Sequence, residues 1–490
     1  MGKTKVTDFY VYRHRYTLGY ALLIIAVASL LFVVGVLSPG GISNAEKLST
    51  VTSDTLAPFT AITEAPRHLI DAPYHLLQKA SINLLGVSAL SIKLPSLILG
   101  GLAIFALHGL LRLWFRRNVA LITSVIAAST GLFLFTAQDG TPAITYFFLN
   151  VILLWAVSML TRGKNTSSIW LIFAAATAAF SLYSPLQLYI IVGLVITCLV
   201  HPHARFVVFR RPLWAIISAG VAFIVVVAPL IAGIISDPSI IKSLLGIPSE
   251  AIFSQARLEI LTQEYLGFWR PLNGSFIAPA YGLGLILLAS IGLYRLFTAK
   301  YTAKSYILTI WLILTIPIII LVPESAGFTL LPIVLLLAFA IDYLIRSWYQ
   351  LFPFNPYARV AGLLPLAVLV IGLSVPCIER MVYGYHYSPD AASAYTRDIA
   401  ILDKQKGILL VPDNEKLFYE TYAKHRQQDT LSVVSSLNEA RSLSAEQGTT
   451  QPVIVEYSFK AAIGTIPNKI LVDDTTNKSA RFYLYTDASI

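Results

Sequence analysis

Residues 18–37 read LGYALLIIAVASLLFVVGVL, and no charged side chain interrupts these twenty positions. An α-helix of about twenty residues covers the ~30 Å hydrocarbon core of a bilayer. The basic residues Lys3, Lys5, Arg13 and Arg15 precede the run. A signal peptide also begins in this way, but the run is long for one and has no convincing small-residue cleavage site. We therefore interpret it as a retained membrane helix.

The composition of the whole chain indicates a polytopic membrane protein. Its 490 residues are 56% hydrophobic and only 13% charged, with a mean hydropathy of +0.70, whereas soluble domains are about one quarter charged. The net charge of +10 would also suit a nucleic-acid-binding protein, but the positions of Lys and Arg argue against that class. Cys198 and Cys377 both lie in apolar runs and predict no disulfide framework.

Eleven apolar runs are long enough to form membrane-spanning helices. A tight turn in LYSPLQLY separates the fifth run from the sixth, because Pro185 and its polar neighbours interrupt the hydrophobic pattern. The predicted spans are 18–38, 91–113, 119–137, 142–161, 168–184, 186–200, 212–235, 278–297, 306–322, 327–345 and 360–378.

Lys and Arg concentrate in alternate connections between these runs. One set of connections is basic: Arg112, Arg116 and Arg117; Arg162 and Lys164; Arg205, Arg210 and Arg211; Arg295, Lys300 and Lys304; Arg346 and Arg359. The opposite turns AQDGT, YSPLQ and PESAG contain neither Lys nor Arg. The positive-inside rule therefore predicts a multi-pass protein of the plasma membrane, with a cytoplasmic N-terminus (1–17) and everything after residue 380 on the outer face.

Most polar residues on the predicted outer side fall in three segments, which are 39–90, 236–276 and the tail from 385. In the first, APRHLIDAPYHLLQKASINLLGV has the spacing of short amphipathic helices in the membrane interface. In the tail, GILLVPD, QPVIVEYSF, NKILVDD and ARFYLYTD indicate strands, and SAYTRDIAILDK and NEKLFYETYAKHR indicate helices. The tail, residues 385–490, is predicted to be a small extracytoplasmic α/β domain after a transmembrane domain at 18–380.

Two carboxylates lie at the predicted outer membrane boundary. Glu46 follows the first helix in SPGGISNAEKLSTVTS, residues 38–53, and Asp139 lies in the turn AQDGT. A carboxylate in a desolvated site has a raised pKa and can act as a general base, whereas the alternative is a solvated loop residue. The sequence contains neither a phosphate-binding GxxxxGK[ST] loop nor a GxGxxG turn, and no Cys/His cluster has metal-ligand spacing. A cytoplasmic nucleotide site is therefore unsupported.

Several cations share this predicted depth. They are Lys93 at the start of the second span, Arg67, His75 and Lys79 in the first loop, and Arg270 in YLGFWRPLNG. Each alone is explained by a side chain that reaches lipid headgroups. Together around a carboxylate, they suit a cleft that binds phosphate.

The order of these parts resembles a known family. Residues 72–115 read APYHLLQKASINLLGVSALSIKLPSLILGGLAIFALHGLLRLWF, and the AQDG turn follows the third helix. Over about residues 18–345 the chain resembles the membrane-embedded glycosyltransferases with the GT-C fold, in particular the protein-mannosyltransferase and aminoarabinose-transferase branch. The resemblance sets Glu46 at the family's first-loop acidic position, Tyr74 in its PLYH-like motif and Lys93 in its R-L-P-S motif.

The resemblance implies a polyprenyl-phosphate-sugar donor in the membrane and an acceptor hydroxyl on a protein, lipid or glycan, with membrane lipids and no nucleic acid as partners. The sugar, a hexose or pentose, would transfer with inversion. Glu46 would accept the acceptor proton, and Asp139 would orient the acceptor or a cation. Lys93, with Arg67, His75 or Arg270, would stabilise the leaving lipid phosphate, and Lys79 and Tyr74 are further donor-binding candidates. No cofactor is certain, and the participation of a divalent cation stays open.

Two other functions remain as alternatives. A transporter or lipid flippase would show inverted repeats and broken helices with charges near mid-membrane, and the sequence shows neither. A non-catalytic scaffold that displays the outer domain would leave the fifty-residue first loop unexplained.

Overall fold

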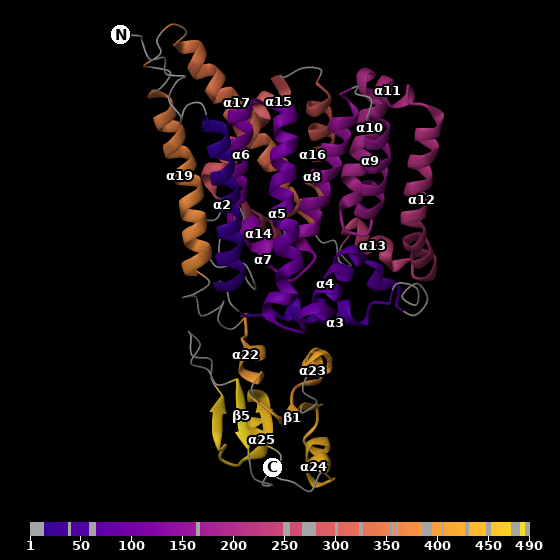
Figure 1. Ribbon diagram of the computed structural model, residues 1–490, viewed down its shortest axis with the longest axis vertical. Coiled ribbons are helices and arrows are strands. Elements are labelled where there is room, and N and C mark those ends of the chain that lie inside the picture. Colours follow the sequence, from indigo (N-terminus) through magenta and orange to yellow (C-terminus); the bar gives the residue numbers. More distant parts are fainter. Residues whose placement is uncertain are drawn as a thin grey trace.

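The apolar runs form helices, and the computed structural model arranges them as a bundle (Figure 1). The structure describes residues 14–37, 41–57, 65–162, 167–247, 255–266, 281–298, 302–322, 327–352, 354, 357, 361–384, 394–403, 405–426, 431–446, 452–471 and 481–485. Arg270 lies outside these ranges, as does much of the predicted 236–276 loop.

The bundle consists of the helices that follow the predicted spans. They are α2 (Arg15–Leu37), α5 (Ala89–Trp114), α6 (Arg117–Ser129), α7 (Gly131–Gln138), α8 (Ala143–Leu160), α9 (Ser167–Ser181), α10 (Gln187–Val200), α11 (Pro202–Phe209), α12 (Leu213–Ser236), α15 (Leu283–Thr298), α16 (Ala303–Leu321), α17 (Leu330–Leu351) and α19 (Leu363–Glu379). A π-helical turn, Arg380–Gly384, follows α19.

Six of the described helices are long and apolar enough to cross a membrane, or eight if two bent pairs each count as one span. The pairs are α6 with α7, bent by 62°, and α10 with α11, bent by 95°. Three further apolar helices, α2, α9 and α15, offer shorter apolar stretches of 10–17 residues. Every predicted run therefore contains an apolar helix, while the count of eleven spans stays a prediction.

Close packing inside the bundle depends on small residues. Gly292 of α15 lies against α17, where a Cβ atom would stand only 1.9 Å from the carbonyl oxygen of Leu336. No side chain larger than hydrogen fits at that crossing, so the glycine sets how closely the two helices approach. The largest buried cluster of the protein is apolar and runs through these helices.

Short helices cover one end of the bundle, which we call the loop end (Figure 1). They are α3 (Asn44–Thr55), a 3₁₀ turn at Pro66–Leu69, α4 (Ala72–Leu85) and α13 (Ser239–Leu245), with α14 (Gln255–Leu266) further along the chain. The predicted short helices of the first loop are therefore present. Helix α4 exposes Leu76, Leu77 and Leu84 and buries His75 and Gln78. That pattern, inverted relative to a helix in water, suits a helix that lies against lipid.

A five-stranded sheet follows the bundle in the chain and lies beyond the loop end (Figure 1). Its elements are α22 (Asp398–Leu402), β1 (Gly407–Leu410), α23 (Asp413–His425), β2 (Leu431–Val434), α24 (Leu437–Glu446), β3 (Val453–Glu456), a 3₁₀ turn (Tyr457–Phe459), α25 (Lys460–Ile463), β4 (Lys469–Leu471) and β5 (Phe482–Tyr485).

The strand order is β2-β1-β3-β5-β4, with β1 parallel to both neighbours and β5 antiparallel to both of its own. The four segments expected to be strands coincide with β1, β3, β4 and β5, whereas β2 and α24 were not foreseen. We call residues 394–485 the C-terminal domain. A buried cluster joins this domain to the first loop and to the start of α5, because Phe418 and Tyr419 of α23 share it with Ile42, Ile82 and Ile92.

Candidate active site

Helix α3 begins at the candidate site with a capping box. The Glu46 backbone N–H donates to Ser43 Oγ at 3.2 Å, and the Ser43 backbone N–H donates to Glu46 Oε2 at 2.8 Å. Ser at the N-cap and Glu three residues later form the usual sequence for this motif, so local sequence fixes where α3 begins. It also turns the Glu46 carboxylate toward the bundle.

The second oxygen of that carboxylate contacts the turn between α7 and α8. The Gly140 backbone N–H donates to Glu46 Oε1 at 2.7 Å. A Cβ atom on Gly140 would lie 2.6 Å from Ile92 Cγ2 and 3.2 Å from Glu46 Oε1. Only glycine permits this approach, so the turn and the carboxylate are matched in shape as well as in hydrogen bonding.

Lys93, in the first turns of α5, faces the same carboxylate. Its Nζ lies 3.7 Å from Glu46 Oε1, and the exposed fractions of the two side chains are 1% and 0%. The ammonium also lies 5.8 Å from the ring centroid of Tyr395, which belongs to the C-terminal domain. A buried ion pair results, in which each charge compensates the other.

Asp139 completes a carboxylate pair with Glu46. It is half-buried in the turn after α7 and accepts a hydrogen bond from the Thr141 hydroxyl. Desolvation and the neighbouring Glu46 carboxylate raise the pKa of Asp139 to about 7, although Thr141 and Lys93 act in the opposite direction. The predicted residues Glu46, Asp139 and Lys93 are therefore together in one cluster.

Gln78 of α4 holds the parts of this cluster in register. Its Nε2 donates to the carbonyl oxygens of Ile92 at 3.0 Å and Gly140 at 2.8 Å. Its Oε1 accepts from the hydroxyls of Ser49 and Ser53 on α3, at 2.8 and 2.6 Å. One buried amide thus joins α3, α4, α5 and the 139–142 turn, with all four of its hydrogen bonds directed to different partners.

His75 and Tyr74 lie beside Gln78 and are also buried. Because the Ser53 hydroxyl donates to Gln78, His75 Nδ1–H donates to Ser53 Oγ at 2.8 Å. Desolvation and nearby His68 lower the pKa of His75 to about 4, so this ring is neutral at neutral pH. The Tyr74 hydroxyl pairs with Ser96 Oγ at 2.7 Å, and Ser96 donates to the Thr141 carbonyl oxygen at 3.4 Å.

Two of the predicted cations contact other parts of the protein. Lys79 Nζ donates to the carbonyl oxygens of Asp54 at 2.8 Å and Leu56 at 2.7 Å, which closes the C-terminal end of α3. Arg67 is mostly exposed and pairs with Asp237 at 3.1 Å. Their roles in donor binding stay predictions.

The sequence did not predict four residues of this cluster, Gln78, Ser49, Ser53 and Gly140. A signal existed for part of this set, because Ser49 and Ser53 are four residues apart and so share one face of α3. Among the described residues, no group of three or more His, Cys, Asp or Glu side chains could hold a metal ion. The participation of a divalent cation stays open.

The comparisons with known proteins cover part of the helical bundle by sequence and most of the chain by structure. The family described as dolichyl-phosphate-mannose-protein mannosyltransferase matches residues 73–232, which include Lys93 and Asp139 but not Glu46. No curated protein matches the chain.

Solved structures show the fold. An ArnT from Cupriavidus metallidurans bound to undecaprenyl phosphate has a TM-score of 0.55 and 15% identity, over 95% of this chain and 97% of that one. The chain has the GT-C fold. The Archaeoglobus fulgidus oligosaccharyltransferase, tethered to an acceptor peptide with the NVT sequon, shares this GT-C fold at a TM-score of 0.54 and 11% identity, over 91% of this chain and 70% of that one. A third structure, the same archaeal enzyme with an inhibitory peptide and a dolichol-phosphate, has a TM-score of 0.52 and 12% identity, over 91% and 70%.

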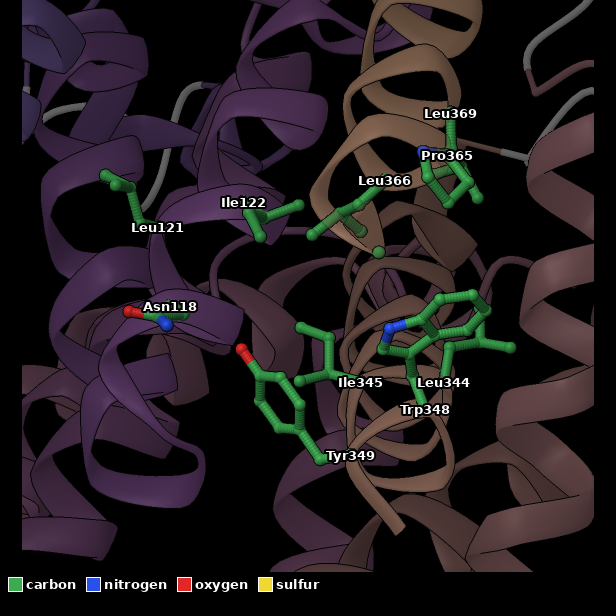
Figure 2. Close-up of a pocket in the computed structure, with 11 residues that line it drawn as sticks. Asn118, Leu121, Ile122, Leu344, Ile345, Trp348, Tyr349, Pro365, Leu366 and Leu369 are labelled. Carbon is green, nitrogen blue, oxygen red and sulfur yellow. The ribbon is translucent and has the colours of Figure 1, made fainter. Parts of the chain in front are cut away.

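An apolar cavity of about 390 Å³ lies between α6, α17 and α19 (Figure 2). Leu121, Ile345, Trp348 and Leu366 line it, and Asn118 is one of its few polar residues. Asn118 is in the first turn of α6, whereas Asp139 follows the end of α7, so this cavity is remote from the carboxylate pair. Its walls suit hydrocarbon rather than sugar or phosphate.

Proposed function

We propose that this protein is a glycosyltransferase that moves a sugar from a polyprenyl-phosphate donor to an acceptor hydroxyl. Three observations support this. The solved structures that share the GT-C fold include complexes with undecaprenyl phosphate and dolichol-phosphate. A carboxylate pair with a buried lysine lies at the loop end of the bundle. The sequence lacks a nucleotide-binding motif, which a lipid-linked donor does not need.

The reaction is a single displacement. The acceptor oxygen forms a bond to the anomeric carbon while the bond from that carbon to the phosphate oxygen breaks. The acceptor proton goes to an enzyme carboxylate, and the polyprenyl phosphate leaves with the electron pair. One displacement inverts the anomeric configuration.

Asp139 is the better candidate for the proton acceptor. The observation that carries this assignment is that Asp139 is half-buried whereas the Glu46 side chain is fully buried. Both oxygens of Glu46 already accept backbone hydrogen bonds, and its side chain is fully buried. Asp139 is half-buried, and a pKa of about 7 suits a general base at neutral pH. The sequence alone favoured Glu46 as the base. The geometry favours a different division, in which Glu46 tunes Asp139 and Asp139 accepts the proton.

Lys93 is the proposed partner of the leaving phosphate. In the present conformation its ammonium contacts Glu46 and Tyr395 and is 1% exposed, so donor binding must open this contact. Tyr74, His75, Lys79, Arg67 and Arg270 stay candidates for the rest of the donor site. Because His75 is neutral near pH 7, it would act as a hydrogen-bonding group rather than as a charge.

An apolar cavity beside the cluster offers space for part of the lipid chain. Its volume is about 280 Å³, and it is lined by residues of α4, α5, α8 and α9, including Tyr74, Leu99, Phe148 and Phe173. Tyr74 is the link to the cluster, because its hydroxyl reaches the Thr141 carbonyl through Ser96. A hydrocarbon chain in this cavity would bring its phosphate toward the carboxylate pair.

The proposal includes the topology expected from the basic connections. Eleven spans, a cytoplasmic N-terminus and an extracytoplasmic C-terminal domain in the plasma membrane would set the transfer site at the outer face. The acceptor would be a protein, lipid or glycan that approaches from that side.

Turnover of the purified protein in lipid nanodiscs, with defined polyprenyl-phosphate sugars, tests the assignment. Asp139→Asn should lower turnover by ~10²–10⁴-fold, because it removes the base but keeps the shape. Asp342→Asn is the matched control, since it also converts a carboxylate to an amide but lies in an ion pair with Arg346 on α17. Wild-type turnover by Asp139→Asn would refute the assignment. A loss confined to Glu46→Gln would return the role of base to Glu46.

A further inference from the structure

Adjacent residues at the start of α3 are held by different parts of the protein. Glu46 binds Gly140 and Lys93 of the helical bundle. Lys47 points to the C-terminal domain, where its Nζ donates to Asp398 Oδ2 at 2.9 Å and to the Tyr419 hydroxyl at 3.3 Å. Neighbouring helical residues project in different directions, so the first turn of α3 contacts both parts at once.

Lys47 belongs to a buried set of charges that we call the C-terminal charge cluster. Asp398 accepts hydrogen bonds from Lys47, from the Tyr419 hydroxyl at 2.7 Å and from Arg481 at 3.2 Å. Burial alone would raise the pKa of Asp398, but Lys47 and Arg481 hold it below its usual value. The members of the cluster are Lys47, Asp398, Glu415, Tyr419, Glu456 and Arg481.

The segment before α3 is fixed by the same domain. Ile42 and Thr396 exchange two backbone hydrogen bonds, at 2.8 and 3.1 Å, directly before the capping residue Ser43. Tyr395, the residue before Thr396, has its ring centroid 5.8 Å from the Lys93 ammonium. The C-terminal domain therefore contacts both sides of the Glu46–Lys93 pair. It fixes the segment before Glu46 through the Ile42–Thr396 hydrogen bonds, and its Tyr395 ring contacts Lys93.

A second attachment holds the far end of α3. Asp54 accepts from Lys424 Nζ at 2.9 Å and pairs with His425 Nε2 at 2.8 Å, and both partners are at the end of α23. Helices α3 and α23 run side by side, because Lys47 meets Glu415 and Tyr419 while Asp54 meets the last turn.

Helix α3 needs this external support. It has twelve residues, NAEKLSTVTSDT, of which most are Ser, Thr, Val, Asp and Asn. These residues are poor helix formers, and isolated helices of this length are marginal in water. The position of Glu46 therefore depends on what holds α3.

We propose that the C-terminal domain positions the candidate active site, with Lys47 as the positioning residue that keeps Glu46 against the Gly140 amide and Lys93. The catalytic consequence rests on the proposed function, whereas the structural consequence does not. Glu46 holds Gly140, the residue after Asp139, and raises the pKa of Asp139, so a displaced Glu46 also displaces the proposed base. Because misplacement of a reacting group by about 1 Å can cost ~10²-fold in rate, a domain without substrate contacts can control turnover in this way.

Hydrogen exchange at Gly140 tests the structural part without any activity assay. Lys47→Met should release the first turn of α3, so that the peptide covering residues 136–145 exchanges at least ~5-fold faster. The double variant Lys47→Met/Asp398→Asn should do the same while it leaves the net charge of the cluster unchanged. Lys424→Met is the matched control: it removes a lysine that is 65% exposed, His425 still binds Asp54, whose side chain is largely buried, and exchange at Gly140 should stay within ~2-fold.

Unchanged exchange at Gly140 in the folded Lys47 variants would overturn the proposal. If neither variant gives monodisperse protein, the cluster supports the whole fold, and the local positioning role is refuted.

Turnover then separates this proposal from the proposed function. Lys47→Met should lower kcat by ~10²-fold with the donor KM unchanged, and it should add less than ~2-fold to the loss in a Glu46→Gln background. Multiplicative losses would mean that Lys47 acts independently of Glu46. Wild-type turnover by both Glu46→Gln and Asp139→Asn, with faster exchange at Gly140 in Lys47→Met, would refute the catalytic mechanism and leave the positioning contact intact.

Discussion

The Glu46–Lys93 pair gives a stability prediction that the structure makes quantitative. Lys93→Met removes one charge of a pair whose exposed fractions are 1% and 0% and whose charged atoms are 3.7 Å apart. At an effective dielectric constant of about 20, the attraction over that distance is ~4.5 kcal/mol. Breaking a buried pair from one side typically costs about 3–5 kcal/mol, because the remaining charge stays buried without compensation. We expect Lys93→Met to destabilise the bundle by about that amount.

The pair also predicts how the loss is recovered. Glu46→Gln/Lys93→Met removes both charges, but the glutamine has a single amide oxygen and can accept from only one of the two backbone N–H groups, that of Gly140 or that of Ser43. The double variant should therefore be more stable than Lys93→Met alone, and it should remain ~1–3 kcal/mol below the wild type because one buried N–H group has no acceptor. Unfolding by SDS in mixed dodecylmaltoside micelles measures the free energy of unfolding of the wild type, of Lys93→Met and of the double variant.

Arg67→Met serves as the control for this series, since it removes an exposed arginine from the same loop and should leave the unfolding midpoint unchanged. The reasoning fails if Lys93→Met unfolds at the wild-type midpoint, or if the double variant is as unstable as the sum of its single changes.

Three further outcomes follow from the same geometry. The pKa of Asp139 is raised to about 7 and the base must be ionised, so kcat/KM should fall as the pH drops through about 7. Glu46→Gln should move this fall in kcat/KM to lower pH. An unshifted pH profile would contradict the coupling between the two carboxylates. Gly140→Ala should lower turnover and should lower the free energy of unfolding in SDS by about 1–3 kcal/mol, because its Cβ would meet Ile92 at 2.6 Å. Gly220→Ala is the control, because open space surrounds Gly220, and it should change neither quantity. Ser442→Cys should react with a membrane-impermeant maleimide in intact cells while His203→Cys on α11 stays protected, and the reverse pattern would invert the topology.

Much of the helical fold could be predicted from sequence because a bilayer demands long apolar runs. The break after α9 followed from Pro185, and α10 indeed begins two residues later at Gln187. Helix α11, which follows a bend of 95°, was not predicted, although Pro202 at its first position is a local signal for a helix start. Strand β2 was not predicted because its sequence, LSVV, contains only three apolar residues and is flanked by polar residues on both sides.

The candidate site shows where sequence information stops. The shared depth of Glu46, Asp139 and Lys93 indicated that they would meet, and depth follows from the ends of apolar runs. The direction in which a side chain points does not follow from those ends. Arg67 and Lys79 share the same predicted depth, yet Arg67 contacts Asp237 and Lys79 contacts the end of α3.

The contact between Lys47 and Asp398 joins residues that are 351 positions apart. Such a pairing depends on how the C-terminal domain sits on α3, and no periodicity in either segment specifies it. The same holds for Gly140, whose importance arises only where its amide meets Glu46.

The central claim is that this chain consumes a polyprenyl-phosphate sugar through its carboxylate pair, and the level of that lipid in cells measures it most directly. Cells that lack the chain should accumulate a lipid-linked sugar, identified by mass spectrometry of the extracted polyprenyl phosphates. Expression of the wild-type chain should return the level to normal, and Asp139→Asn, expressed to the same amount in the membrane, should not. An unchanged pool of lipid-linked sugars in cells without the chain, or full recovery with Asp139→Asn, would contradict the account.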